Sequence, residues 1–153
     1  MVFEAIRRQL GRSVPFARLL DIAVDGIDAQ QARARLPDRS ELTNHVGSVH
    51  AGALFTLCES ASGAALAGAI AEQIMQVRLL VRDAQIEYLK PARGTVLAGA
   101  QLAEDGATLL AALRRDGRVD VAIDVSAQTI ANDGRQIVVA RASFNWQVRL
   151  NPS

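Results

Sequence analysis

The sequence is short of the residues on which several kinds of functional site depend. It contains one cysteine, two histidines and a single lysine among 153 residues. One cysteine excludes an internal disulfide and a cysteine-rich zinc site. His45 and His50 can be combined with Glu59 as a metal set, but their spacing matches no standard site. We therefore expect neither a disulfide nor a metal centre.

Strong charge, a secretory signal and common nucleotide motifs are absent as well. The formal net charge is +1 and the arginines are dispersed, so nothing points to nucleic acid or a membrane surface as partner. The opening residues, MVFEAIRRQLGRSVPF, lack the apolar core of a secretory signal. No P-loop, Rossmann glycine pattern, HExxH motif or nucleophile elbow is present. These absences favour a cytoplasmic protein with no nucleic-acid or membrane partner.

Composition and periodicity are those of an ordinary globular protein, and we expect a single domain over residues 1–153. Gly26 predicts a bulge or turn, and the alternation reverses phase near Arg82-Asp83, which predicts a second irregularity. In the segment 138–150, the even-numbered residues from Val138 to Leu150 are apolar and would share one face of a strand. The patterns predict short helices over 3–10 and 104–115, a hairpin over 21–36, a long helix over 51–70, and strands over 77–88, 95–102, 119–127 and 138–150.

These elements form an α+β arrangement, with one long helix against one amphipathic, mostly antiparallel sheet. A single sheet with a single long helix leaves apolar surface uncovered. We therefore expect a homodimer, with a dimer of dimers as a further option.

The long helix from Ala51 to Ile70 is the centre of the predicted fold. Twelve of its twenty residues are Ala, Gly or Ser, which lets neighbouring backbone approach closely. The side chains that form its apolar stripe are Leu54, Leu57, Cys58, Ala61 and Ala65. Glu59 lies off that stripe and is the only charged residue in the segment. A charge at the centre of a membrane helix costs roughly 2.5–3.5 kcal/mol, so we reject a membrane span.

Glu59 is the strongest candidate for chemistry. A carboxylate on a buried helix is costly unless it has partners or a raised pKa, and both are traits of functional sites. A solvated or paired surface carboxylate is the simpler alternative. The free N–H groups at the helix start, around Ala51 and Gly52, are candidates for stabilising an oxyanion. A Cys58–His50 pair fails, because eight helical residues rise about 12 Å.

The residues Asn44, Gly47, His50, Gly52 and Glu59 follow the pattern N-x-x-G-x-x-H-x-G-x(6)-E. This pattern resembles the core motif of hotdog-fold acyl-CoA thioesterases of the phenylacetate-degradation type. The segment YLKPARG, residues 88–94, and the order of the elements over nearly the whole chain are also similar to that superfamily. The resemblance implies a curved antiparallel sheet of about five or six strands wrapped around one long helix.

The resemblance also implies roles for individual residues. Glu59 would be the nucleophile or the general base, and the N–H of Ala51 would polarise the thioester carbonyl. Asn44 would hold the substrate carbonyl or the attacking water, while His50 would shape the loop. The chain departs from the superfamily at Ala51, where glycine is usual, and at Gly63, where some relatives have Thr or Ser. Ser60 and Ser62 are both left as substitutes for that hydroxyl.

We accordingly expect hydrolysis of an acyl-CoA or related thioester, with no cofactor beyond the coenzyme A of the substrate. A hotdog protein that binds acyl thioesters with little or no catalysis is the main alternative, followed by a hydratase or dehydratase. The expected substrate-binding residues are His50, Gly47, Ser62, Gly63, Arg82, Lys90 and Arg93, and Arg78 is a further candidate cation for coenzyme A. Because Ala51 and Glu59 are about 12 Å apart along one helix, we expect each site to combine the two subunits of a dimer.

Overall fold

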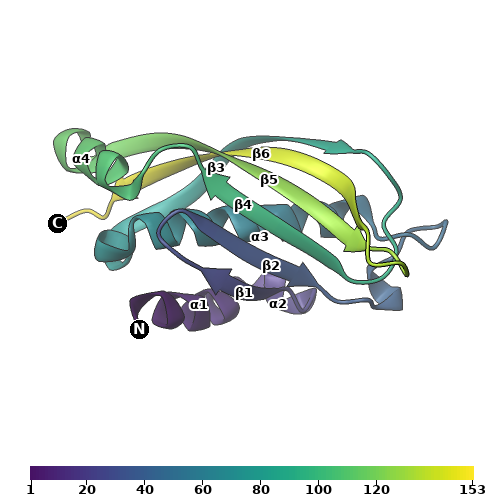
Figure 1. The fold of residues 1–153 in the computed structure, drawn as a ribbon. Helices are drawn as coiled ribbons and strands as arrows, with labels where there is room; N and C mark the ends of the chain where they lie inside the picture. The colour runs from purple at the N-terminus through teal and green to yellow at the C-terminus, as the bar shows by residue number, and fades with distance from the viewer.

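A six-stranded antiparallel sheet curves around helix α3 in the computed structural model, which describes residues 1–153 (Figure 1). The strand order is β1-β2-β4-β5-β6-β3, so β1 and β3 are the two edges. The elements are α1 (Val2–Ser13), α2 (Pro15–Leu19), β1 (Ala23–Ile27), β2 (Gln31–Leu36), η1 (Ser40–Leu42), α3 (Ala51–Ala69), η2 (Ala71–Gln76), β3 (Val77–Tyr88), β4 (Val96–Leu102), α4 (Gly106–Asp116), β5 (Arg118–Ile130) and β6 (Gln136–Leu150). The expected α+β architecture is confirmed.

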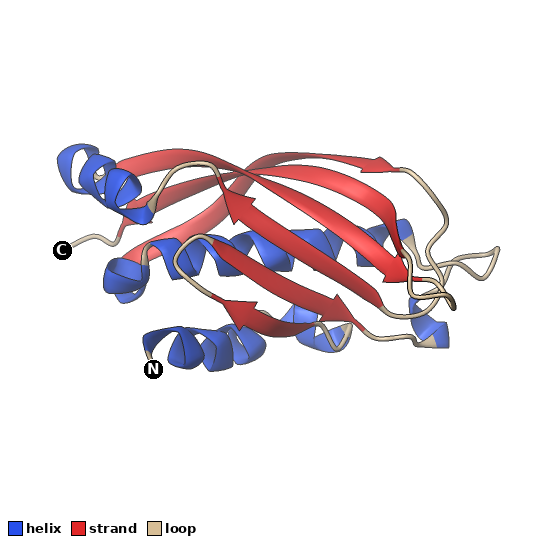
Figure 2. Cartoon of the chain, viewed as in Figure 1, coloured by secondary structure: helices blue, strands red, loops and turns tan.

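The helices and the sheet form separate layers (Figure 2). Helix α3 lies along one face of the sheet, α1 and α2 lie beside the β1 edge, and α4 lies at the end of the sheet where β5 starts. The first helix continues past Gly11 to Ser13, further than the predicted end, and the chain turns into α2 at Pro15. Proline is favoured at a helix start because it lacks an N–H that would otherwise be unpaired there.

The predicted irregularities in the sheet occur at or close to the expected positions. The β1–β2 register shifts between Val24 and Gly26, and the β3–β6 register shifts between Val81 and Asp83. A third irregularity was not predicted. The partner of β5 changes from Ala140 opposite Ala127 to Val138 opposite Gln128, so Val139 is skipped. Val139 is consequently the buried residue, and the prediction that Val138 shares the inner face is wrong.

The core forms between the inner face of the sheet and the apolar stripe of α3. The stripe residues are all buried as predicted: Leu54, Leu57, Cys58, Ala61 and Ala65. From the sheet, the largest fully buried side chain is Phe144, which packs edge-on against Phe55 of α3 with ring centroids 5.1 Å apart. Small residues on the helix let the sheet approach at this short range.

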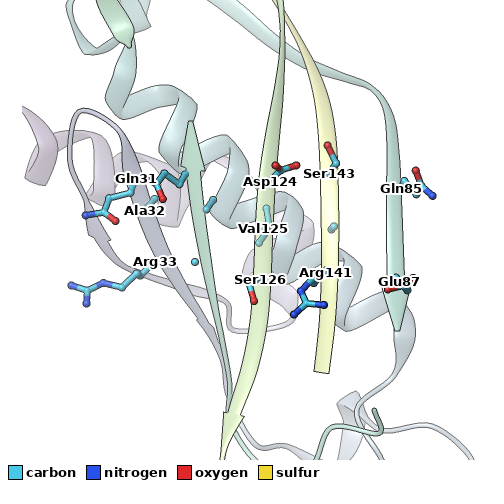
Figure 3. A pocket seen from close by; sticks show the side chains of 14 residues that line it. Gln31, Ala32, Arg33, Gln85, Glu87, Asp124, Val125, Ser126, Arg141 and Ser143 are labelled. Carbon is cyan, nitrogen blue, oxygen red and sulfur yellow. The ribbon is translucent and has the colours of Figure 1, made fainter. Parts of the chain in front are cut away.

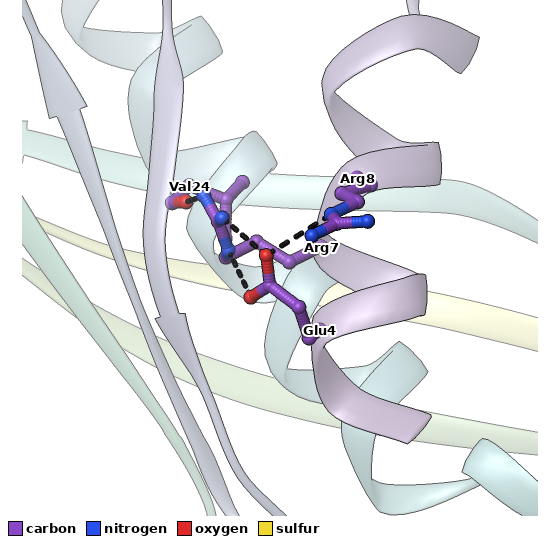
Figure 4. A network of polar contacts seen from close by, with 4 residues as sticks. All are labelled: Glu4, Arg7, Arg8 and Val24. Carbon is purple, nitrogen blue, oxygen red and sulfur yellow. Dashed lines mark hydrogen bonds and ion pairs between the residues drawn. The ribbon is translucent and has the colours of Figure 1, made fainter. Parts of the chain in front are cut away.

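Helix α1 is tied to the β1 edge by a small polar network (Figure 4). The Arg7 guanidinium donates to the Val24 carbonyl of β1 over 3.3 Å and to both carboxylate oxygens of Glu4. The hydrogen bond from Arg7 lowers the pKa of Glu4 to about 2. Because an exposed strand edge can pair with other chains, the helix also protects this side of the sheet.

Substitution of Gly68 by alanine is expected to destabilise the fold by about 1–3 kcal/mol. A Cβ at Gly68 would overlap the Asp28 carbonyl oxygen and approach Ile27 Cγ2 at 2.6 Å. The overlap with backbone outweighs a gain in helix propensity of up to about 1 kcal/mol. Urea unfolding measures the change, and Gly99→Ala is the matched control, since a Cβ there meets nothing within 4 Å. Equal stabilities of the two variants would contradict the close α3–β1 packing.

Candidate functional site

Glu59 is half-buried on α3 and faces a mostly apolar cavity of about 590 Å³. The cavity lies between α3, the segment from α1 to β1, and the edge strand β3. The residues that line it are Leu10, Gly11, Val14, Phe16, Ala17, Arg18, Ile22, Val24, Phe55, Thr56, Glu59, Ser60, Gly63, Ala64, Leu79, Leu80, Val81 and Trp146. An apolar cavity with one acidic group can hold an apolar ligand group beside that carboxylate.

The carboxylate of Glu59 has no hydrogen bond and no ion pair within the chain. Its polar neighbours on α3 are turned to the backbone: Thr56 Oγ1 donates to Gly52 O over 2.8 Å, and Ser60 Oγ donates to Thr56 O over 2.7 Å. Burial raises the pKa of Glu59 above its ordinary value, with no compensating partner. A carboxylate in this state holds its proton more readily than usual, which suits a group that must accept and release protons.

The start of α3 leaves one N–H group available rather than the two that were predicted. His50 caps the helix, and its Nδ1 accepts from the Gly52 N–H over 2.8 Å. The N–H groups of Ala53 and Leu54 both donate to His50 O. The Gly52 amide is therefore occupied, and the Ala51 amide remains as the free donor. His50 shapes this turn, and its acceptor role places the ring proton of the neutral form on Nε2.

The loop before α3 is organised by Asn44. Its Oδ1 accepts from the N–H groups of Val46 and Ser48, each over 3.1 Å, and its Nδ2 donates to Ser48 Oγ over 2.8 Å. Gly47 has φ +77°, a conformation that favours glycine, and its carbonyl accepts from Arg93 over 2.8 Å. Asn44, Gly47 and Arg93 thus build the loop and do not line the Glu59 cavity.

The structure separates the two serines that sequence reasoning left open. Ser62 is fully buried, accepts from Trp146 Nε1 over 2.9 Å and donates to the Glu59 carbonyl over 2.8 Å. Its prediction as a substrate-binding residue is contradicted by this burial in the chain. Ser60 lines the cavity instead. Gly63 also lines it, and a Cβ there would meet the Trp146 ring at 3.1 Å, so the glycine makes room for the indole.

The predicted coenzyme A cations lie in different places. Arg82 pairs with Asp120 over 2.8 Å, and Asp120 belongs to the outer face of the sheet, away from α3. Lys90 and Arg93 follow β3 near the start of α3, where Ala92 O accepts from Val49 N and the Tyr88 hydroxyl donates to Ala51 O over 3.1 Å. The segment 88–94 and the helix start are therefore joined, and Lys90 and Arg93 lie at this junction, where the Arg93 guanidinium donates to Gly47 O.

Sequence reasoning missed the contribution of the N-terminal helices to the cavity. Leu10, Phe16 and Arg18 come from α1 and α2. Nothing in their local pattern distinguishes them from a surface helix. Trp146 was assigned to the inner face of the last strand, and its contact with Ser62 and Gly63 is visible only after folding.

A second hollow of about 670 Å³ lies on the outer face of the sheet (Figure 3). Its walls are largely polar side chains, among them Arg33, Asp124 and Arg141. None of the predicted site residues lines it. The apolar cavity at Glu59 is the better candidate for chemistry because it joins an unpaired carboxylate to apolar walls.

The remaining candidates are not assembled into a site. No group of three or more His, Cys, Asp or Glu side chains is placed to hold a metal ion. Burial raises the pKa of the Cys58 thiol to about 12, which keeps it from acting as a thiolate at neutral pH. None of the helices has the length and apolar character needed to cross a bilayer.

The chain is similar in sequence and in structure to several known proteins. A protein of Halobacterium salinarum named "Putative esterase VNG_1336C" is 29% identical over 128 residues, which cover 82% of this chain and 80% of that protein. Two solved structures superpose closely. Protein PA5026 of Pseudomonas aeruginosa, described as a "Probable Thioesterase", has TM-score 0.79 and 24% identity over 97% of this chain and 95% of that one. The PaaI protein of E. coli, from the phenylacetic acid degradation operon, has TM-score 0.70 and 16% identity over 99% and 95%.

At these identities the solved structures establish the fold, which is the hotdog fold implied by the sequence motif. Family membership rests on a separate match. The model of a family described as "Domain of unknown function (DUF4442)" covers residues 3–148, nearly the whole chain. This protein therefore belongs to the DUF4442 family and has a hotdog fold.

Proposed function

We propose that this protein hydrolyses an acyl thioester, and specifically an acyl-CoA, to the free acid and thiol. The observation that carries the proposal is Glu59, an unpaired, half-buried carboxylate of raised pKa in an apolar cavity. The names of the similar proteins, an esterase and thioesterases, support the same class of reaction.

The chemistry assigns one task to each end of the site. The Ala51 N–H polarises the thioester carbonyl and stabilises the oxyanion that forms on its oxygen. Glu59 either takes a proton from a water that attacks the carbonyl carbon, or attacks that carbon itself. In the first route Glu59 returns its proton to the sulfur as the carbon–sulfur bond breaks, and the thiol leaves. In the second route the carbon–sulfur bond breaks to release a thiolate, which takes a proton from water. Water then hydrolyses the anhydride formed on Glu59.

The two groups cannot act together within one chain. They are eight residues apart on α3, a rise of about 12 Å, whereas both must lie within about 3.5 Å of one carbonyl group. A glutamate side chain leans toward the helix N-terminus but spans only part of this gap. Each site in our proposal therefore takes its donor from one subunit and its carboxylate from the other.

The edge strand β3 supports such a dimer. It is 12 residues long, pairs only with β6 inside the chain, and carries Leu80, which is 62% exposed. A long unprotected edge is a template for pairing with a second chain. The other edge is only five residues long and is covered by α1. Pairing of two β3 strands about a two-fold axis would set the two α3 helices antiparallel, with each N-terminus near the partner's Glu59.

A release assay for free thiol with a panel of aromatic and straight-chain acyl-CoAs tests this function. We expect turnover of at least one member above the rate of Glu59→Gln protein purified in the same way. Tight binding of acyl-CoA with no turnover by either protein would instead establish a binding protein. The absence of both binding and turnover across the panel would reject an acyl-CoA function.

The pH profile is a second expectation from the raised pKa of Glu59. Either role needs the ionised carboxylate, so kcat/KM should rise with pH through the pKa of Glu59, at a midpoint above the ordinary value of 4.5. Initial rates from pH 4 to pH 8 measure this limb, and a midpoint at or below 4.5 would contradict it.

The same shift predicts how stability depends on pH. The pKa of Glu59 is higher in the folded than in the unfolded state. The free energy of unfolding therefore decreases as pH rises from below 4.5 through the folded pKa. Glu59→Gln removes this decrease. Its melting temperature relative to wild type should therefore be more favourable at pH 7 than at pH 4.

A further inference from the structure

Three arginines lie side by side across three strands on the outer face of the sheet. Arg118 of β5 is directly opposite Arg149 of β6, and Arg149 is directly opposite Arg78 of β3. We call these three residues the arginine row. Their inner-face neighbours Val119, Val148 and Leu79 point toward α3, so the row points outward. It lies at the end of the sheet beside α4, because Arg118 starts β5 two residues after α4 ends at Asp116.

None of the three guanidinium groups has a hydrogen bond or an ion pair within the chain. The nearby acidic side chains are hydrogen-bonded to other residues. Asp120 accepts from Arg82 over 2.8 Å and from Gln147 over 3.2 Å, while Asp116 pairs with Arg115 over 3.0 Å. The hydrogen bond from Arg115 is the main cause that lowers the pKa of Asp116, and the charge of Arg118 adds a smaller lowering effect.

The row contrasts with two other arginines on the same face, each of which has an acidic residue beside it. Arg141 of β6 is directly opposite Glu87 of β3, and Arg35 pairs with Asp25 over 3.0 Å. Directly opposed like charges destabilise a sheet, with Cβ atoms only about 4.5–5.5 Å apart. Two such contacts in succession oppose folding, and an anion bound between them would relieve the repulsion.

The surface next to the row is hollowed. Arg118 and Arg149 line an open depression of about 920 Å³ together with Arg115 and Arg82. Four guanidinium groups from α4, β3, β5 and β6 thus border one space, together with the carboxylates of Asp116 and Asp120. These two acids pair with Arg115 and Arg82, which leaves Arg118 and Arg149 as the unpaired charges of the hollow. Guanidinium groups bind phosphate oxygens in a paired, planar geometry, and a space of this size admits a ligand as large as a nucleotide.

We propose that the arginine row and this hollow form a binding site for a phosphate-bearing anion. Arg118 and Arg149 are its principal contacts, and Arg115 is an accessory one. Two sources supply such a group: the phosphates at the nucleotide end of coenzyme A, which rests on the proposed function, and a free phosphate compound such as a nucleotide. The site lies on the opposite face of the sheet from Glu59 and is distinct from the cavity.

Calorimetric titration with inorganic pyrophosphate tests the site without any turnover. We expect binding to the wild-type protein that weakens with added salt and falls at least about tenfold in Arg118→Gln and in Arg149→Gln. Arg141→Gln is the matched control, because it removes the same charge from the same strand and face. Equal affinity in Arg149→Gln and Arg141→Gln, or no binding to wild type at millimolar pyrophosphate, would overturn the proposal.

Thermal unfolding checks that the variants are folded. Loss of one arginine from the row removes repulsion, so Arg149→Gln should melt at or above the wild-type temperature. Pyrophosphate should raise the melting temperature of wild type more than that of the variant.

Titration with 3′-phospho-ADP, the nucleotide end of coenzyme A, identifies the source of the phosphate group. If this compound competes with pyrophosphate and Arg149→Gln raises KM for acyl-CoA at unchanged kcat, the site serves coenzyme A. If pyrophosphate binds but KM is unchanged, it serves a free phosphate ligand.

Discussion

Replacing Glu59 by glutamine is expected to lower the turnover of an acyl-CoA at least about a hundredfold, while the affinity for the substrate is retained. Glutamine has nearly the size of glutamate, so the cavity keeps its shape. It carries no charge and neither accepts a proton from water nor forms an anhydride. The reaction therefore loses its base or nucleophile, whichever role Glu59 has.

The measurement is a comparison of kcat and of binding with a non-hydrolysable acyl-CoA analogue. Glu87→Gln is the matched control, since it makes the same change in an exposed glutamate on the outer face of the sheet. We expect this control to retain wild-type turnover. Near-normal turnover by Glu59→Gln would remove Glu59 from the mechanism, whereas loss of binding together with turnover would assign it to substrate binding.

Mixed dimers should recover activity from two inactive chains. One chain carries Glu59→Gln, and the other carries Ala51→Pro, which removes only the proposed oxyanion donor. Loss of one such donor costs about 10²–10³ in turnover. Proline suits this position because it is the first residue of the helix and His50 before it is extended, with φ −61° and ψ 138°. Helix α3 should therefore remain intact.

In a shared site, the mixed dimer has one site with both defects and one with neither. Random mixing in equal amounts makes half of the dimers mixed, so the sample should recover about a quarter of wild-type activity. Ala51→Ser keeps the backbone N–H and is the control for the side-chain change. A verified mixed dimer without activity would show that each chain carries a complete site.

Local sequence patterns were sufficient for the elements and for the strongest candidate residue. The apolar stripe of α3, its position in the chain, and the bulges at Gly26 and after Val81 follow from short-range periodicity, because side-chain direction in a helix or strand depends on neighbouring residues. Glu59 stood out for the same reason, as the single charge on a segment of small and apolar residues. The extent of α1 was less visible, since Gly11 does not end that helix.

Only the tertiary structure decided which groups meet. That Gly52 is capped by His50 while Ala51 is free, and that Ser60 rather than Ser62 faces the cavity, depends on the exact turn of the chain and on Trp146 from a strand 84 residues away from Ser62. The arginine row joins residues 78, 118 and 149, which share no local pattern. Such contacts depend on strand register, which is fixed by the packing of the whole sheet against α3 and which no short segment specifies.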